Sequence, residues 1–479
     1  MVSLITSLES AGDQIREVVG SSSLLTDKKS LKQYSSDQSF VPSRSPLMAV
    51  KASSEEEVQN IIRIADSSGL PVTPYSTGKN NQGAAIQSVP GMVLDLSEMT
   101  KIIEIDTISR NAVIEPGVTF HDLQSAARKK GLRVLTPIEQ PSSASVLATY
   151  LEYVPTYSWA KYGDENILTM HVVLPSGKLL RTGAAAYPVV EKPYDPVHVP
   201  FSYLGKIWFG SQGTLGVVTR GAVKLKNIHD RNEAKFISLD KFDKAPNLIR
   251  RIKTLRLGEE LFLLNKMELA LLLSKQSSQV KAMRSSLPNW SIVIVVRGDD
   301  AEFRFQAEDL NDICKKQGVK AEDSPKGAGD AGKIILKEIE DPRGWTHTSQ
   351  YKGARSTLPF IAPIRKLPIF QTIVNDLAKS HSYDVSDIGT MIVPGEVSRV
   401  FFQYSFSRNP ADKEQVRRGK ELYYACAKKL ISSGAFFYRP YGDIARFVYD
   451  RSPAYHRIIQ LFKKTVDPNG IMNPGKLGM

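Results

Sequence analysis

The segment Ser76-Thr77-Gly78-Lys79-Asn80-Asn81-Gln82-Gly83 is a loop of small and amide residues between two predicted strands, at residues 70–75 and 92–96. In such a loop successive backbone N–H groups can point to one concave side, which suits a pyrophosphate. The loop is neither a Rossmann fingerprint nor a P-loop. It has no GxGxxG, Thr73 stands where a P-loop has its first glycine, and Asn80 replaces the Ser or Thr after the lysine. Taken alone, the segment also fits an ordinary turn.

Around this loop, short apolar runs alternate with amphipathic helices. We predict a strand at residues 47–50, a helix from Ser54 to Ser68, strands at 102–105 and 111–115, and a helix over 119–130. A Pro-Ser-Gly turn at 175–177 joins two strands, which indicates a hairpin. Residues 229–427 repeat helix and strand patterns without a cofactor-type loop, so we assign them to a separate substrate-side domain.

Length and composition limit the possible classes of protein. At 479 residues the chain exceeds the size of one hydrophobic core, which predicts two or more domains. The two cysteines, Cys314 and Cys426, form no CxxC and no Cys/His cluster, which argues against a disulfide framework, a zinc site or an iron–sulfur cluster. Redox chemistry in this chain would therefore need an organic cofactor.

The net charge of +13 raises the question of nucleic-acid binding. The basic runs, such as Arg417-Arg418, lie in helical patterns, which indicates solvated helix faces, and no nucleic-acid motif accompanies them. We therefore expect no nucleic-acid partner. A positive surface could instead attract an anionic substrate or an acidic electron-carrier protein.

The chain shows no secretory or membrane-spanning pattern. Near the N-terminus, Glu9, Asp13 and Glu17 interrupt the apolar residues, which recur at helical spacing. The strongly apolar stretch at 290–296 is too short to cross a bilayer and predicts a buried strand. We expect a cytoplasmic protein.

Several further signals follow the loop in a fixed order. They are Glu115-Pro116-Gly117-Val118-Thr119, Ser142-Ser143-Ala144-Ser145-Val146, Tyr162-Gly163-Asp164, the hairpin from Val173 to Gly183, Gly216-Val217-Val218-Thr219, and Asp467-Pro468-Asn469-Gly470-Ile471 through Gly475-Lys476. In this order and spacing the chain resembles the vanillyl-alcohol oxidase and p-cresol methylhydroxylase flavoprotein family over about residues 45–479.

The resemblance implies an α+β fold, with a two-lobed FAD-binding domain and an α+β cap domain over the isoalloxazine. On this basis we expect an N-terminal helical segment at 1–45, the FAD-binding domain at 46–228, the cap at 229–430 and a C-terminal segment at 431–479 that returns to the FAD domain. The implied cofactor contacts are Tyr75, Ser76, Thr77, Gly78, Lys79, Asn80, Asn81 and Gly83 at the pyrophosphate; Ser142, Ser143, Ser145, Val146, Thr149, Gly163 and Asp164 along the flavin and ribityl chain; Gly216, Val217 and Val218 on the adenine side; and Asn473 and Lys476 in the C-terminal return.

Residues Tyr438 and Arg439 resemble the Tyr-Arg pair of the family's active site. Hydride arrival at flavin N5 leaves negative charge near N1 and C2=O, and a fixed guanidinium such as that of Arg439 would stabilise it. Tyr438 would then hydrogen-bond a substrate oxygen. The alternative is a Tyr-Arg pair on a strand edge at the surface.

The departures from the family concern substrate and flavin attachment. The loop lacks the tyrosine that phenol oxidisers carry there, and Gln140, or Glu139 with a one-residue shift, stands where the family has an aspartate near N5, so the acid/base residue is open. Ser398 and Arg399 stand where the oxidase has histidines, so we predict noncovalent FAD.

In the cap, Arg355 and Arg365 are candidates to bind a substrate carboxylate in a fork, unless they are surface charges. The scattered histidines lack the metal motif of related 2-hydroxyacid dehydrogenases, so we expect no metal.

The leading hypothesis is an FAD-dependent dehydrogenase or oxidase that takes hydride from an alcohol, benzylic or hydroxy-acid-like small molecule, with a homo-oligomer expected. The second hypothesis is a flavoprotein subunit that relays electrons or supports assembly in a larger redox complex. A basic nucleic-acid binder is the third.

Overall fold

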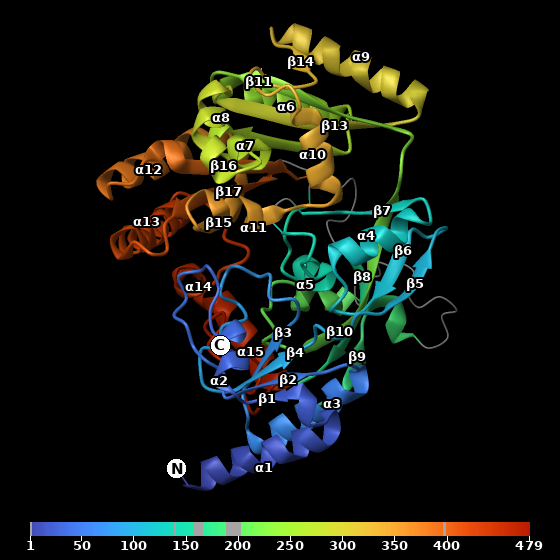
Figure 1. The fold of residues 1–479 in the computed structure, drawn as a ribbon, viewed down its shortest axis with the longest axis vertical. Coiled ribbons are helices and arrows are strands. Elements are labelled where there is room, and N and C mark those ends of the chain that lie inside the picture. Colours follow the sequence, from blue (N-terminus) through green and yellow to red (C-terminus); the bar gives the residue numbers. More distant parts are fainter. Residues whose placement is uncertain (1, 138–139, 157–165, 188–202, 396–398) are drawn as a thin grey trace.

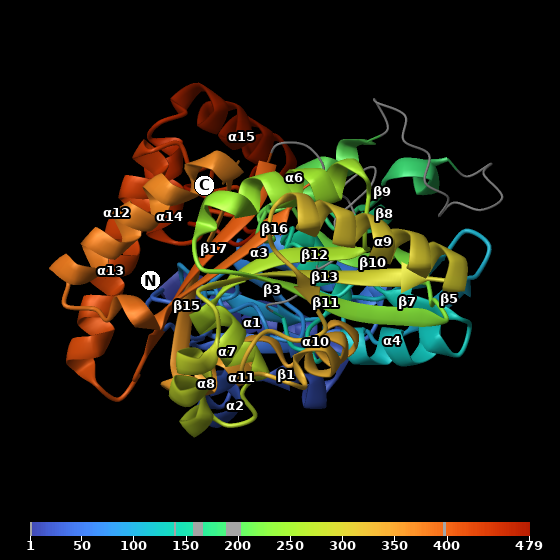
Figure 2. The same cartoon turned by 90° about the horizontal axis from the view of Figure 1, so that it is seen from above.

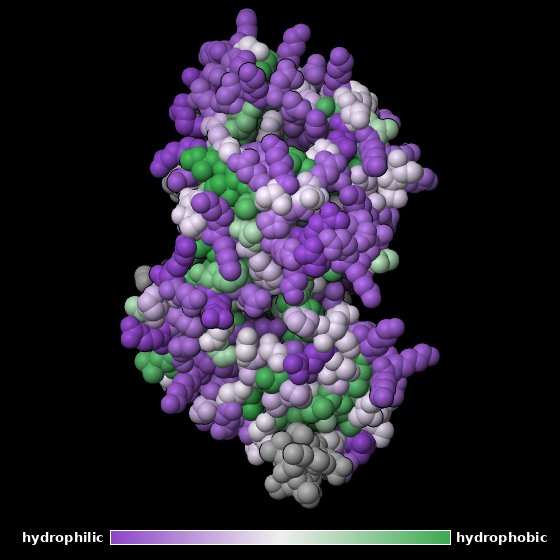
Figure 3. All heavy atoms as spheres, turned by 90° about the vertical axis from the view of Figure 1, so that its left-hand side faces the viewer, coloured by the Kyte–Doolittle hydropathy of each residue, from purple (hydrophilic) through white to green (hydrophobic). Residues whose placement is uncertain are grey.

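The computed structural model describes all residues except 1, 138–139, 157–165, 188–202 and 396–398. Three sheets organise the chain: two small sheets form one half of the molecule, and a larger sheet forms the other half (Figure 1). The outline narrows between these two halves in Figure 3, which also shows a mostly hydrophilic face with small hydrophobic patches.

The first small sheet has the strand order β1-β2-β4-β3, and its β2–β4 and β3–β4 pairs are parallel. Its strands are β1 (Leu24–Leu25), β2 (Met48–Lys51), β3 (Val72–Tyr75) and β4 (Met92–Asp95), and the helices of this part are α1 (Val2–Val19), α2 (Lys28–Leu31) and α3 (Glu55–Ser68). The side chain of Ser54 caps α3 by accepting a hydrogen bond from Glu57 N, and Gly69 ends the helix at φ 66°. The parallel strands place the loop after β3 at the carboxyl edge of the sheet.

The second small sheet has the order β5-β6-β10-β8-β9, and β7 also pairs with β10. Its elements are β5 (Ile102–Asp106), β6 (Asn111–Ile114), α4 (Phe120–Arg128), β7 (Leu132–Val134), α5 (Val146–Leu151), β8 (Ile167–Val173), β9 (Leu179–Arg181) and β10 (Val217–Asn227). The predicted hairpin is confirmed, because β8 and β9 pair in an antiparallel ladder.

The large sheet has seven strands in the order β14-β11-β13-β12-β16-β17-β15, all antiparallel to their neighbours. The strands are β11 (Arg231–Leu239), β12 (Glu260–Asn265), β13 (Trp290–Gly298), β14 (Ala321–Glu322), β15 (Ala354–Pro363), β16 (Ile388–Pro394) and β17 (Arg399–Arg408). Its helices are α6 (Ala245–Thr254), α7 (Lys266–Leu273), α8 (Val280–Ser286), α9 (Asp300–Lys316), α10 (Ala331–Glu340), α11 (Gly344–Thr348), α12 (Leu367–Ser380) and α13 (Lys413–Ser432). Figure 2 shows these helices over the sheet from above.

Helices cover both faces of the large sheet, which explains the apolar stretch at 290–296. Ile292 and Ile294 point into the core shared with α6, α9, α12 and α13, whereas Val293 and Val295 point into the core shared with α7, α8 and α10. Because both faces of β13 are buried, the strand is apolar without alternation. The prediction of a buried strand is therefore confirmed.

The C-terminal segment returns to the first small sheet. It contains α14 (Asp443–Tyr449) and α15 (Pro453–Val466), and after α15 Met472 forms a parallel bridge with Val72 of β3. Upstream, Phe436 pairs with Ile361 at the end of β15. The segment therefore connects the large sheet to the loop after β3.

The α+β fold is confirmed, with one difference at the N-terminus. Residues 24–25 form β1, which pairs with β2, so the predicted helical segment also contributes a strand. Two leucines are too few to show a strand periodicity, so only tertiary pairing identifies them. None of the helices in the described part of the chain is long and apolar enough to cross a membrane.

Candidate functional site

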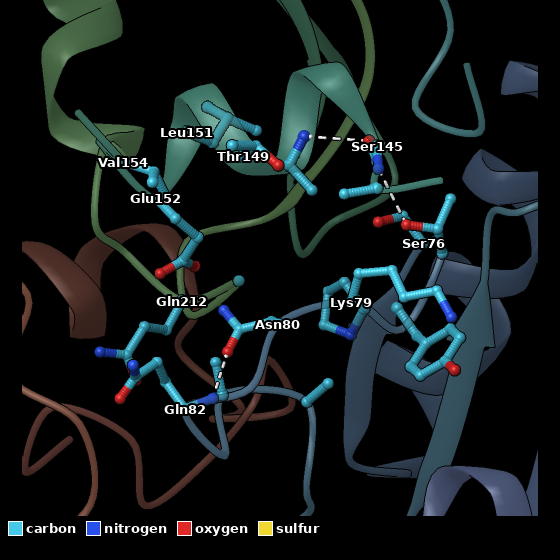
Figure 4. Close-up of a pocket in the computed structure, with 18 of the residues that line it drawn as sticks. Ser76, Lys79, Asn80, Gln82, Ser145, Thr149, Leu151, Glu152, Val154 and Gln212 are labelled. Carbon is cyan, nitrogen blue, oxygen red and sulfur yellow. Dashed lines mark hydrogen bonds between the residues drawn. The ribbon is translucent and has the colours of Figure 1, made fainter. Parts of the chain in front are cut away.

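A cavity of about 1420 Å³, its mouth included, lies where the two small sheets, the large sheet and the C-terminal segment meet (Figure 4). Its wall is built from several separated pieces of chain. They are residues 74–82 with 84–85 after β3, residues 144–145, 147–149, 151–152 and 154 around α5, residues 208, 211–213 and 216–218 before and into β10, the single residues Leu96, Pro116 and Gln140, single residues of the large-sheet half such as Trp345, Arg355, Thr357 and Gln403, and Arg439 with Tyr441.

The loop of residues 76–83 is held on several sides by hydrogen bonds. Thr77 Oγ1 accepts from Ser145 N at 2.9 Å, Asn81 Oδ1 accepts from Gln38 N at 2.9 Å, and Gln82 Nε2 donates to Thr357 Oγ1 at 2.7 Å. The loop is therefore fixed to the N-terminal part, to α5 and to β15 at once. This rigidity suits a surface that must present backbone N–H groups in one arrangement.

The segment of residues 211–218, part of which also lines the cavity, contains residues with unusual backbone conformations. Gly216 has φ 132°, and a Cβ placed there would lie 2.6 Å from the carbonyl oxygen of Val173. Gln212 has a left-handed backbone at φ 53°, and its Nε2 donates to Pro440 O at 2.9 Å. Left-handed backbone at a residue other than glycine is a conformation that proteins tend to retain at functional sites.

The C-terminal return supports the loop from behind. The Asn473 side chain accepts from Thr73 Oγ1 at 3.1 Å and donates to Gln212 O at 2.6 Å. Lys476 Nζ donates to the carbonyl oxygens of Gly83 and Ile86 at 2.9 and 2.6 Å. Burial lowers the pKa of Lys476 to about 8. Asn473 and Lys476 therefore hold the cavity wall, and neither of them lines the cavity.

A cluster of ionisable groups stands at one end of the cavity. The Tyr441 hydroxyl donates a hydrogen bond to the carboxylate of Glu152, and Arg439 acts on the same carboxylate through its charge. Arg439 is 6% exposed, and among the described residues its Nε has no hydrogen-bond partner. Burial would lower the pKa of Arg439, but the charges of Tyr438, Tyr441 and Glu152 raise it. The guanidinium therefore stays charged at the cavity wall.

Tyr438 stands behind Arg439 in an aromatic cluster. The guanidinium carbon of Arg439 lies 5.2 Å from the centroid of the Tyr438 ring, and the ring makes edge contacts with Tyr153 and Phe401 at 5.9 and 5.5 Å. The Tyr438 hydroxyl is buried, and it forms no hydrogen bond of good geometry with any of the described residues. Burial raises its pKa.

The two arginines predicted to bind substrate lie in different environments. Arg355 lines the cavity, but its Nη2 donates to both carboxylate oxygens of Glu268 at 2.7 and 2.6 Å, and its Nη1 donates to Thr348 Oγ1 at 2.8 Å. Its fork is therefore already occupied. Arg365 is exposed beyond β15 and is not among the residues that line the cavity, because the chain turns outward after Pro363.

Many of the predicted cofactor contacts come together in this cavity. Those that line it are Tyr75, Ser76, Thr77, Gly78, Lys79, Asn80, Asn81, Ser145, Thr149, Gly216, Val217 and Val218, together with the predicted catalytic residues Gln140 and Arg439. Those that do not line it are Gly83, Ser142, Ser143, Val146 and Tyr438. Gly163 and Asp164 lie outside the described residues. So does Ser398, which stands where the related oxidase has a histidine.

Sequence reasoning missed Glu152, Tyr441 and Gln212. Glu152 follows a short helix of small and apolar residues and Gln212 precedes a glycine, so neither has a local pattern that marks a functional site. Tyr441 had a usable signal, because it stands two residues after Arg439 in the same short segment.

The residues present fit an FAD. The cavity is lined by the fixed loop at residues 76–82 and by Gly216, where a Cβ would collide with the carbonyl oxygen of Val173. Gln140 Oε1 and Arg439 Nε are buried polar atoms without partners among the described residues, and both residues line the cavity. Buried polar groups of this kind are expected to meet a polar ligand. Among the described residues there is no His/Cys/Asp/Glu group that could hold a metal ion.

Comparisons with known proteins agree with this geometry. Residues 46–183 match the family described as the FAD binding domain. An FAD-linked oxidoreductase of Mycobacterium tuberculosis is 25% identical over 96% of this chain and 97% of its own length, and a glycolate oxidase subunit of Bacillus subtilis is 22% identical over 88% and 87%. The flavoprotein subunit of 4-cresol dehydrogenase (hydroxylating) from Pseudomonas putida is 31% identical over 37% of this chain and 35% of its own length.

Solved structures show the same fold over nearly the whole chain. p-Cresol methylhydroxylase with substrate bound has a TM-score of 0.86 at 18% identity, covering 99% of this chain and 97% of that protein. The 4-ethylphenol oxidase of Gulosibacter chungangensis has a TM-score of 0.86 at 20% identity, with the same coverage. The chain is therefore an FAD-linked oxidoreductase that contains an FAD-binding domain, FAD is its cofactor, and its fold is that of p-cresol methylhydroxylase.

Proposed function

We propose that this oxidoreductase removes hydride from a hydroxyl-bearing carbon of a small alcohol, with benzylic alcohols as the preferred class and hydroxy acids as the second. The observation that carries the proposal is the charged, buried guanidinium of Arg439 at the cavity wall, beside the Glu152–Tyr441 pair. When bound, FAD supplies the two-electron acceptor, at N5 of its isoalloxazine ring. Every other group that the reaction needs comes from this chain.

Arg439 would stabilise the negative charge that hydride transfer leaves on the reduced ring. A guanidinium that is fixed in a dry site does this well, because it needs no reorganisation during the step. Its Nε is not committed to any described residue, in contrast to the fork of Arg355, which Glu268 and Thr348 occupy. We therefore assign the electrostatic role to Arg439 and none to Arg355.

The similarity to the flavoprotein subunit of 4-cresol dehydrogenase (hydroxylating) supports a substrate with a ring. Tyr438, Tyr153 and Phe401 contact one another beside Arg439, with Phe209 6.2 Å from Tyr153. None of these four rings is among the described residues that line the cavity, so the cluster supports Arg439 from behind. Two relatives, a probable D-lactate dehydrogenase and a glycolate oxidase subunit, support hydroxy acids as the second class of substrate. A simple phenol held by two tyrosines is disfavoured, because the loop at 76–83 carries no tyrosine.

The pyrophosphate is assigned to the loop at 76–81, the flavin and ribityl chain to Ser145 and Thr149, and the adenine side to Gly216–Val218.

We propose that the flavin is held noncovalently. Electrons are proposed to leave through an acidic carrier protein, and rapid mixing of the reduced protein with air tests this. Reoxidation within the turnover time would identify an oxidase instead.

An anaerobic reduction screen tests the function. The purified yellow holoprotein is mixed with benzyl alcohol, 4-hydroxybenzyl alcohol, D-lactate and glycolate, and the flavin absorbance is followed. Bleaching that is fastest with a benzyl alcohol supports the proposal. Bleaching by a hydroxy acid alone moves the substrate to the second class, and no bleaching by any of the four overturns the proposed function.

A further inference from the structure

Glu152 is the one carboxylate among the described residues that line the cavity. The other polar side chains of the wall are amides such as Asn80 and Gln212, hydroxyls, and the cations of Lys79, Arg355 and Arg439. Amides and cations do not accept a proton near neutral pH. In Figure 4, Glu152 comes from the end of α5 and points toward the part of the cavity where Asn80 and Gln212 lie.

The fold fixes where this carboxylate stands. The backbone N–H of Glu152 closes the last turn of α5 on Ala148 O at 3.0 Å, and the next residue, Tyr153, reverses the chain with a left-handed backbone at φ 57°. That conformation is unfavourable for a tyrosine. The Tyr153 ring is held among Phe209, Phe401 and Tyr438, so packing supports the strained turn.

The surroundings of Glu152 suit a group that takes up and releases a proton. Two ionisable side chains act on its carboxylate: Tyr441, which donates a hydrogen bond to it, and Arg439. Burial raises the pKa of Glu152, while the Tyr441 hydrogen bond and the Arg439 charge oppose that rise. A general base works best when its pKa is near the working pH. A carboxylate in water would be too weak a base.

We propose that Glu152 is the proton acceptor of the reaction and that Tyr441 positions its carboxylate. This inference rests on the proposed function. The carbon–hydrogen bond of the alcohol breaks with its electron pair, which leaves as hydride to FAD, and the oxygen–hydrogen bond gives its proton to the Glu152 carboxylate. The substrate becomes a carbonyl compound, FAD is reduced by two electrons, and Glu152 ends protonated.

The test compares flavin reduction in holoproteins of the wild type, Glu152→Gln, Glu152→Asp and Tyr441→Phe, across pH, with the alcohol that bleaches the wild type in the screen. Glu152→Gln is expected to slow reduction by about 10²–10⁴-fold and to lose the acidic limb of the pH profile. Glu152→Asp keeps the limb at a lower rate. Tyr441→Phe moves the limb to higher pH, because the lost hydrogen bond favoured the ionised carboxylate.

A second readout needs no substrate. Infrared spectra of the oxidised holoprotein are recorded as the pH is lowered. In the wild type, the carbonyl band of a protonated carboxyl should appear at the pH of the acidic limb. This band should be absent from Glu152→Gln. The matched control is Glu55→Gln. Glu55 is a half-buried glutamate outside the cavity that accepts from Thr219 Oγ1 at 2.6 Å, as Glu152 accepts from Tyr441. Its replacement should leave the reduction rate unchanged.

The outcomes separate the two proposals. If the wild type is reduced and Glu152→Gln keeps the wild-type rate and acidic limb, the role of Glu152 is wrong and the proposed function stands. If the wild type is not reduced by any of the four compounds, both fall. If Glu152→Gln does not retain FAD, an unmoved acidic limb in Tyr441→Phe overturns the role of Glu152.

Discussion

Arg355 and Glu268 form a buried fork in which one guanidinium nitrogen donates to both carboxylate oxygens, at 2.7 and 2.6 Å. Each side chain is 1% exposed, and the pair joins β15 to α7 at the edge of the cavity. Removing one member of such a pair leaves a buried charge without its partner. The pair therefore holds the cap wall of the cavity, although the sequence made Arg355 a candidate to bind substrate.

Arg355→Met should destabilise the protein by about 3–5 kcal/mol, because Glu268 would remain buried and unpaired. The double variant Arg355→Met/Glu268→Met should regain most of that loss. Urea unfolding followed by circular dichroism measures both. The matched control is Arg417→Met, because Arg417 pairs with Glu414 and Glu421 at the exposed surface of α13, and it should change stability far less. A double variant as unstable as Arg355→Met would contradict the pairing argument.

Gly216→Ala should abolish retention of FAD through purification. The new Cβ would lie 2.6 Å from the Val173 carbonyl oxygen, which is backbone and cannot move aside, so the cavity wall must shift. Gly69→Ala is the matched control, since Gly69 also has positive φ at 66° but a Cβ there meets nothing within 4 Å. It should lose about 1–2 kcal/mol of stability and keep its flavin. The ratio of flavin to protein absorbance measures the outcome, and equal flavin content in the two variants would refute the prediction.

Lys476 should make the folded protein more stable as the pH rises from about 8 to 10.5. Burial lowers the pKa of Lys476 from 10.5 to about 8, so between these values the unfolded chain binds more protons than the folded one. The wild type should therefore gain about 2–3 kcal/mol relative to Lys476→Met across this window. Denaturant unfolding of both proteins at a series of pH values measures the difference, and a difference that stays flat would show that Lys476 is not a buried cation.

The flavin should leave the protein completely on acid denaturation. The segment that carries Ser398 offers no histidine where the related oxidase attaches its flavin, and the loop at 76–83 contains no histidine, tyrosine or cysteine. After precipitation in acid, all yellow colour is expected in the supernatant. Flavin fluorescence that stays with the denatured protein band in a gel would establish a covalent link.

Much of the site could be predicted, because each of its main parts is a short continuous stretch of sequence. The loop at 76–82 and the Gly216–Val218 step have characteristic small residues, so their presence in one cavity was foreseeable. For Arg365 the sequence left a substrate contact and a surface charge open, because a charged residue in a turn has the same local pattern in both places, and the structure places it at the surface. Glu152 was missed for the same reason, since Tyr441, which donates a hydrogen bond to its carboxylate, lies 289 residues later in the chain.

The sequence by itself indicated the cofactor and the class of fold, because the ordered set of motifs from residue 76 to residue 476 resembles one flavoprotein family and because helix and strand periodicities are local. The tertiary structure decided which charged groups face the cavity. Whether Arg355, Arg439 or Glu152 is free to act depends on partners from distant segments, namely Glu268, Glu152 and Tyr441. Burial and electrostatic pairing arise only when those segments pack together, so no local pattern specifies them.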